Sequence, residues 1–152
     1  MALSLLERIV VDEKIDLIIG TSMGGMFAQK FRGRLKILIN PAFHVSSYMR
    51  SQLGVHAFLN PRKDGADCFE ITSFLCDLYE SLESFQFNNI DNQEKSLTYA
   101  LFGDEDELIN CQPEYSSYYT NFSKFRGEHR LNEQVIRNIL IPLIEELRQN
   151  EF

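Results

Sequence analysis

Ser22 is the first residue of this chain whose neighbours suggest chemistry. It lies in the stretch GTSMGG, residues 20–25, which fits the pattern Gly-x-Ser-x-Gly. In this pattern a serine occupies a sharp turn between a strand and a helix, and small neighbours let the two elements approach closely enough to expose the hydroxyl. The start of the helix also directs free N–H groups, including that of Met23, toward a developing oxyanion. Ser22 is therefore a candidate nucleophile, and an ordinary glycine-rich turn is the alternative.

A serine nucleophile needs a base, and the base needs a carboxylate that orients it. His129 is the candidate base, because it stands between the last predicted strand and the last predicted helix. An acidic stretch, residues 104–107, follows the preceding strand. Asp106 is the favoured acid in that stretch and Asp104 is the reserve, while the other carboxylates are expected in a solvated turn. The resulting chain order of serine, acid and histidine is the order that α/β-hydrolases use.

Alternating strands and helices are predicted to position these residues. The short apolar run at 16–20 suits a strand that is buried on both faces, and helix formers follow it. Gly33 is expected to end that helix, and Pro142 is expected to kink the last one. Hydrophobic periodicity predicts helices at 2–13, 23–31, 113–120 and after Asn132, and strands at 16–20, 34–42, 96–103 and 123–126.

The short helical connection between the strands at 16–20 and 34–42 indicates a parallel β-α-β unit. Because the carboxyl ends of parallel strands share one edge of a sheet, we expect Ser22, Asp106 and His129 to meet at that edge. The predicted fold class is α/β, a partial α/β-hydrolase fold with about four parallel strands flanked by helices. Residues 1–152 are expected to form a single domain. Within it, residues 44–96 are expected to form a mostly helical, lid-like insertion.

Composition narrows the class of function. The formal net charge of −7 argues against nucleic acid as the main partner, and no apolar run approaches the roughly 20 residues of a membrane span. The three cysteines show no CxxC spacing and leave one unpaired in any disulfide scheme, which favours the reducing cytoplasm. The histidines and cysteines are not spaced as the ligands of a zinc site are. Neither the P-loop motif nor the glycine pattern of dinucleotide-binding proteins occurs. We therefore expect neither a metal nor a cofactor.

Several stretches together resemble one family. They are DLIIGTSMGGMFAQ, ILINPAF, LFGDEDELIN and GEHRLNEQVI, and they resemble the YqiA-like branch of small bacterial α/β-hydrolases, which are regarded as esterases. The resemblance implies Ser22 as nucleophile, Asp106 as acid, His129 as base and the Met23 backbone N–H as an oxyanion donor. It also implies a small-molecule acyl ester as substrate, and a lid or acyl-pocket wall at 44–96. Ordinary core packing of the aromatic residues in that insertion is the alternative.

One feature of the family is not found in this chain. Family members open with a strand that ends in a His-Gly loop, which supplies the second oxyanion donor, and the chain contains no His-Gly pair. Loss of one such donor typically lowers the rate by about 10²–10³. The strand at 16–20 is then expected to present an unpaired edge, through which a homodimer can form. The alternative function is a truncated, weakly active or inactive hydrolase-like module with an interaction role.

Overall fold

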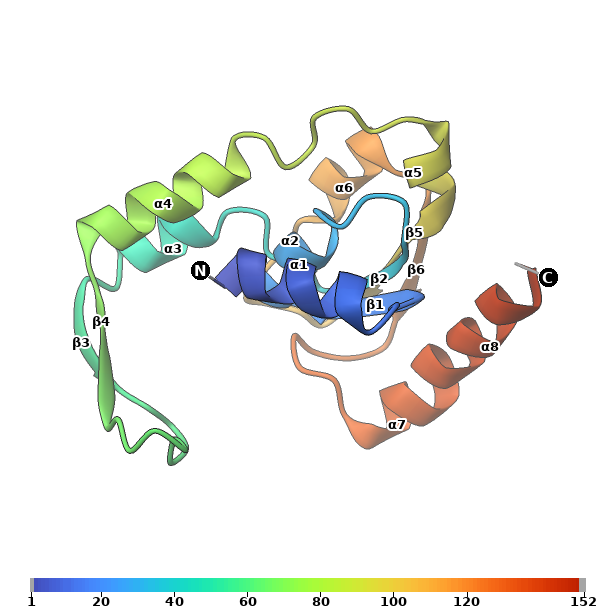
Figure 1. Cartoon of the computed structure of the whole chain (residues 1–152). Coiled ribbons are helices and arrows are strands. Elements are labelled where there is room, and N and C mark those ends of the chain that lie inside the picture. The colour runs from blue at the N-terminus through green and yellow to red at the C-terminus, as the bar shows by residue number, and fades with distance from the viewer. Residues whose placement is uncertain (1, 151–152) are drawn as a thin grey trace. The chain divides into compact units, whose positions relative to one another are not determined.

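The computed structural model describes residues 2–150, which divide into two compact units (Figure 1). Unit 1 comprises the chain up to Ala42 and from Ile90 onward, and unit 2 comprises Phe43–Asn89. Unit 1 contains every candidate site residue. Unit 2 corresponds to most of the segment expected as an insertion, but residues 90–96 belong to unit 1.

Unit 1 is built on a parallel sheet. Its strands are β1 (Leu17–Thr21), β2 (Leu35–Ile39), β5 (Thr98–Gly103) and β6 (Asn121–Phe125), in the order β1-β2-β5-β6. Every neighbouring pair is parallel, and β2 is buried at each position because it lies inside the sheet. The predicted α/β fold with four parallel strands is therefore confirmed.

Helices flank this sheet. They are α1 (Ala2–Asp12), α2 (Met23–Ala28), α5 (Asn92–Leu97), α6 (Gln112–Tyr118), α7 (Glu133–Val135), the π-helical turn η1 (Ile136–Leu140) and α8 (Ile141–Asn150). The last three elements cover one face of the sheet, where Val135, Leu140 and Leu147 pack against apolar side chains of β2, β5 and β6. None of the helices within residues 2–150 has the length and apolar character that a bilayer span requires.

The helix ends follow from local chemistry. Asn132 begins the last helical segment as predicted, because its side chain accepts the Val135 N–H at 2.9 Å. The π-helical turn ends two residues before Pro142, where a kink was predicted. The helix predicted at 23–31 is shorter in the structure, where α2 ends at Ala28. Turns follow it and lead to Gly33 at φ +67°.

A buried ion pair lies inside unit 1. The Lys36 side chain is fully buried, and its Nζ donates to Glu94 Oε2 at 2.7 Å and to the Phe31 carbonyl at 2.8 Å. The other carboxylate oxygen of Glu94 accepts the Gly33 N–H. Burial lowers the pKa of Lys36, and the hydrogen bond with Glu94 opposes that shift. This pair joins β2 to α5.

Unit 2 contains both helices and strands. It consists of α3 (Val45–Arg50), β3 (Gly54–Ala57), β4 (Cys68–Ile71) and α4 (Ser73–Glu83). The Glu83 carboxylate accepts the Ser46 N–H at 2.7 Å and so joins α3 to α4, and the Thr72 hydroxyl caps α4 by accepting the Leu75 N–H at 3.1 Å. Strands β3 and β4 form an antiparallel hairpin (Figure 1). The sequence pattern predicted the helices but not this hairpin.

Candidate active site

Ser22 occupies a strained turn between β1 and α2. Its φ of 53° and ψ of −123° are unusual for a residue with a side chain, and such strain is typical of functional turns. The Ser22 N–H donates to the Ile39 carbonyl at 2.9 Å, and the Ser22 carbonyl accepts the Ala42 N–H at 3.0 Å. These bonds fix the turn against the end of β2, and the Ser22 side chain is half-buried.

Close approach of β1 and α2 explains the glycines around Ser22. A Cβ atom on Gly20 would lie 2.2 Å from the Gly24 carbonyl oxygen, and one on Gly25 would lie 2.8 Å from the Pro41 Cβ. Neither position has room for a larger residue. Met23 is the first residue of α2, so its N–H has no acceptor within the helix. This donor follows the serine directly, as an oxyanion donor in such a turn does.

His129 and Asp106 form a hydrogen-bonded pair. The distance from His129 Nδ1 to Asp106 Oδ2 is 2.7 Å, and the two side chains are 14% and 3% exposed. Asp106 Oδ1 accepts the N–H groups of Leu108 at 2.9 Å and Ile109 at 3.1 Å, so both carboxylate oxygens are engaged. An ionised carboxylate only accepts, which assigns the proton to Nδ1 and leaves Nε2 as the basic nitrogen of the neutral ring.

Asp104, the reserve acid, has a different environment. Its side chain is on the surface, its Oδ1 accepts the Gly127 N–H at 3.1 Å, and its own N–H donates to the Phe125 carbonyl at 3.0 Å. These bonds join the turn after β5 to the end of β6. The structure therefore brings Asp106, and not Asp104, to the imidazole of His129.

Ser22 and His129 are both hydrogen-bonded to residues at the end of β2. Within residues 2–150, no hydrogen bond joins the Ser22 hydroxyl to the His129 ring. Instead, the Ile39 carbonyl accepts the Ser22 N–H, and the side chain of the next residue, Asn40, donates to the His129 carbonyl at 3.0 Å. The sequence analysis did not single out Asn40; the signal available was an asparagine that directly follows a strand and precedes Pro41.

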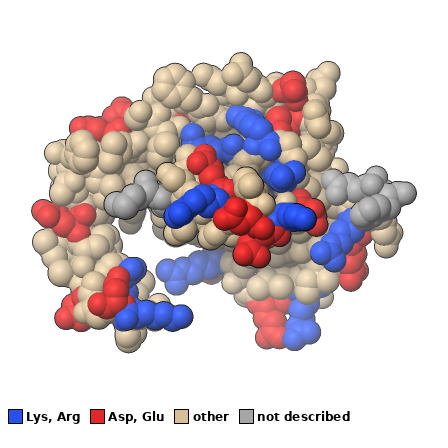
Figure 2. Space-filling view, in the orientation of Figure 1, with Lys and Arg blue, Asp and Glu red and all other residues tan. Residues whose placement is uncertain are grey.

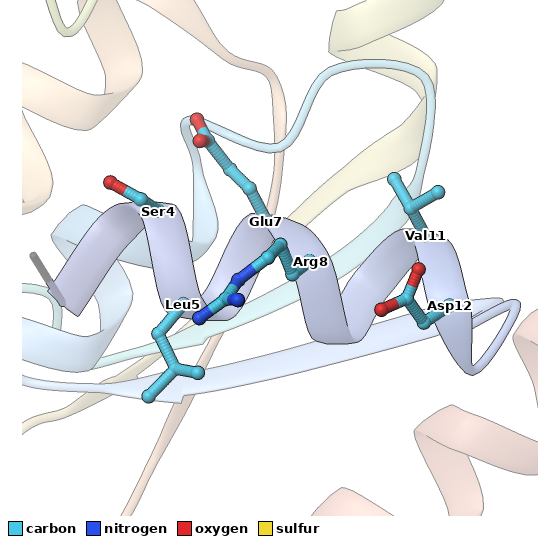
Figure 3. A pocket seen from close by; sticks show the side chains of 6 residues that line it. All are labelled: Ser4, Leu5, Glu7, Arg8, Val11 and Asp12. Carbon is cyan, nitrogen blue, oxygen red and sulfur yellow. The ribbon is translucent and has the colours of Figure 1, made fainter.

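A shallow hollow on α1 is formed by other residues. Figure 3 shows its lining side chains, which are Ser4, Leu5, Glu7, Arg8, Val11 and Asp12. Acidic and basic side chains lie side by side over the same helix (Figure 2). None of these residues belongs to the candidate site, which is located by the Ser22 turn and the His129–Asp106 pair.

Comparisons with known proteins agree with this architecture. The sequence matches the uncharacterised protein family UPF0227 over residues 1–134, whereas a comparison with curated proteins finds no match. One similar structure comes from work on LipS and LipT, two metagenome-derived lipolytic enzymes. It is 14% identical, with 95% of this chain and 70% of that chain covered and a TM-score of 0.61.

Two further structures show the same fold. Est1E from Butyrivibrio proteoclasticus is 15% identical, with 96% of this chain and 67% of that chain covered and a TM-score of 0.60. The α/β hydrolase MGS-MChE2 comes from the metagenome of lagoon sediments at Mar Chica, Morocco. It is 9% identical, with 99% of this chain and 69% of that chain covered and a TM-score of 0.52. The predicted lack of an N-terminal strand and His-Gly loop stays a prediction. The chain belongs to the family UPF0227, and its fold is that of the α/β-hydrolases.

Proposed function

We propose that this chain is a serine hydrolase that acts on small-molecule carboxylic (acyl) esters. The observation that supports it most is the His129–Asp106 pair at 2.7 Å, at the same sheet edge as the strained turn of Ser22. One structural neighbour comes from work on lipolytic enzymes, which favours an ester over other substrates. The resemblance of the sequence to the YqiA-like branch points in the same direction.

In the proposed reaction, the Ser22 Oγ attacks the acyl carbonyl carbon while His129 Nε2 takes the hydroxyl proton. The Met23 backbone N–H stabilises the oxyanion of the tetrahedral intermediate. His129 then returns the proton to the alcohol oxygen as the ester C–O bond breaks, which leaves an acyl group on Ser22. Water repeats the same steps, so the acid is released and the serine is restored. Asp106 holds the imidazole and stabilises its protonated form throughout.

Ester turnover tests the proposal. Short- and medium-chain nitrophenyl esters should be hydrolysed by the purified protein, and Ser22→Ala should reduce turnover to the level of buffer. Ser123→Ala is a matched control, because Ser123 is an exposed serine on β6 and is not a candidate site residue. Equal turnover by the wild type and Ser22→Ala would contradict the assignment of the nucleophile.

Unit 2 is proposed to act as the lid of the enzyme. Taken by itself, it exposes a set of large apolar side chains, which suits contact with an acyl chain. They are Tyr48, Leu53, Val55, Leu59, Phe69, Phe74, Leu78 and Phe85. Cys68, Cys76 and Cys111 form no disulfide among the described residues, in keeping with the proposed cytoplasmic location.

The second candidate function is an interaction module, and the edge of β1 favours it. Among the described residues, β1 pairs with β2 alone, and Ile19 at its centre is 42% exposed. The neighbouring helix α1 also exposes apolar side chains, among them Leu5 and Ile9. Two copies of β1 can pair antiparallel about a two-fold axis, which would give the proposed homodimer.

A further inference from the structure

Asn40 is a buried polar residue at the end of β2 whose side chain the proposed reaction does not use. It is 2% exposed and adopts a φ of 42°, a left-handed conformation that asparagine tolerates better than most residues. Pro41 follows it directly. A residue that is buried, polar and conformationally strained calls for a physical explanation, and its hydrogen bonds supply one.

Its hydrogen bonds reach two other segments of the site. The Asn40 side-chain Oδ1 accepts the Gly103 N–H at 2.7 Å. Its Nδ2 donates to the carbonyls of Glu128 at 3.1 Å and His129 at 3.0 Å. Its backbone N–H donates to the Leu101 carbonyl at 2.9 Å. Because Gly103 offers a donor and the other two residues offer acceptors, the orientation of the amide is determined by its partners.

Each of these segments carries one part of the candidate triad. Gly103 opens the turn that contains Asp106, whose N–H donates to the Gly103 carbonyl at 3.4 Å. The segment of Glu128 and His129 carries the base. Ile39, the residue before Asn40, accepts the N–H of Ser22 at 2.9 Å. One dipeptide at the end of β2 therefore contacts the segments of the nucleophile, the acid and the base.

The acid turn and the base segment also approach each other closely beside this amide. A Cβ atom on Gly103 would lie 2.4 Å from the Gly127 carbonyl oxygen and 2.8 Å from that of Glu128. The two backbones thus meet where only glycine fits, and the Asn40 amide bridges them. Loss of the amide would leave a buried N–H and two carbonyls without this partner at the point where the base is held.

We propose that Asn40 is a positioning residue that sets the place of the His129 imidazole relative to Ser22. The proposal rests on the proposed serine hydrolase function. Asn40 touches no reacting atom; it acts through the backbone of His129. A misplacement of a catalytic group by about 1 Å can lower the rate about 10²-fold, so loss of the amide should reduce the acylation rate and kcat while KM stays the same.

Two substitutions separate positioning from folding. Asn40→Gly removes the amide, and glycine tolerates the positive φ without strain. Asn40→Asp keeps the shape but turns a carboxylate oxygen toward two carbonyls, and only its protonated form can donate to one of them. Asn89→Gly is the matched control, because Asn89 is an exposed asparagine with a φ of 58° in unit 2.

The experiment measures the rate at which a fluorophosphonate probe phosphonylates Ser22, with loss of fluoride, between pH 5 and 9. Circular dichroism verifies folding, and ester kinetics give kcat and KM. We expect Asn40→Gly and Asn40→Asp to lose about 10²-fold in phosphonylation rate at pH 8, with KM for the ester unchanged and Asn89→Gly equal to the wild type. The rate of Asn40→Asp, divided by the wild-type rate, should rise as the pH falls, because protonation restores a donor. The same ratio for Asn40→Gly should stay constant.

Each other outcome has a definite meaning. Folded Asn40 variants that react as fast as the wild type would overturn the positioning role and leave the proposed function intact. Loss of the folded state in both variants would show that the role is structural and would also overturn the proposal. A wild-type protein that is folded but does not react would overturn the proposed function, and the role of Asn40 with it.

Discussion

Asp106→Asn separates the proposed acid from every other carboxylate of its turn. Oδ1 of Asp106 accepts two backbone N–H groups, from Leu108 and Ile109, so the oxygen of an asparagine must take that place. Its amide NH₂ must then face His129 Nδ1, where the Asp106 carboxylate lies at 2.7 Å in the wild type. An amide donor at that position selects the tautomer with the proton on Nε2. The imidazole then cannot accept the serine proton.

The expected loss is large because the base is present but in the wrong tautomer. In a serine protease triad, the equivalent change lowers kcat about 10⁴-fold, which corresponds to about 5.4 kcal/mol at 1.36 kcal/mol for each factor of ten. We expect a similar loss of kcat for Asp106→Asn, with KM nearly unchanged because the acid does not contact the substrate.

Asp104→Asn is the matched control for this prediction. Among the described residues, its carboxylate accepts the Gly127 N–H alone, a bond that an asparagine oxygen can also make, so activity should stay within about tenfold of the wild type. The assay is stopped-flow ester hydrolysis with circular dichroism on each variant. An Asp106→Asn protein that is folded and within tenfold of the wild-type kcat would refute the reasoning. So would an equal loss in Asp104→Asn.

Three further predictions concern stability and association. In urea unfolding, the free energy of unfolding of Gly20→Ala should be lower than that of the wild type by about 1–3 kcal/mol or more, because its Cβ would meet a carbonyl oxygen at 2.2 Å. Gly24→Ala has open space around its Cβ and should not be destabilised, so similar values for both variants would contradict the close approach. Lys36→Met removes the buried cation that pairs with Glu94 and leaves that carboxylate with Arg32 at 3.7 Å, so the free energy of unfolding should fall by up to about 3–5 kcal/mol. Removal of the exposed ion pair of Arg137 should cost about 0.3–0.5 kcal/mol, and equal losses would argue against a buried pair. Ile19→Lys should convert a dimer to a monomer in light scattering, and a monomeric wild type would rule out association through β1.

Much of the fold follows from short-range patterns in the sequence. Strands β1, β2 and β5 are apolar runs, and the parallel pairing of β1 with β2 follows from the short helical connection between them. The turn of Ser22 was predicted because its glycines are adjacent in sequence. Asp106 was favoured over Asp104 as the acid, and the structure places the Asp106 carboxylate against His129.

Other features depend on contacts between residues far apart in the chain. Asn40 is separated by 63 and 89 residues from Gly103 and His129, and no local pattern marks such partners. Lys36 was likewise not expected to be buried, because its partner Glu94 lies 58 residues away. The hairpin of β3 and β4 was missed because each strand has four residues, too few for alternation to be distinguished from a loop.

Covalent labelling of the serine tests the central claim most directly. Folded protein is treated with a fluorophosphonate probe, the intact mass is read, and the modified peptide is sequenced, with Ser22→Ala treated in parallel. The proposed triad predicts one adduct per chain, located on Ser22 and absent from Ser22→Ala. If the folded wild-type protein forms no adduct, the serine hydrolase assignment is contradicted. Equal labelling of the wild type and Ser22→Ala would contradict it too, and either result would favour the interaction module.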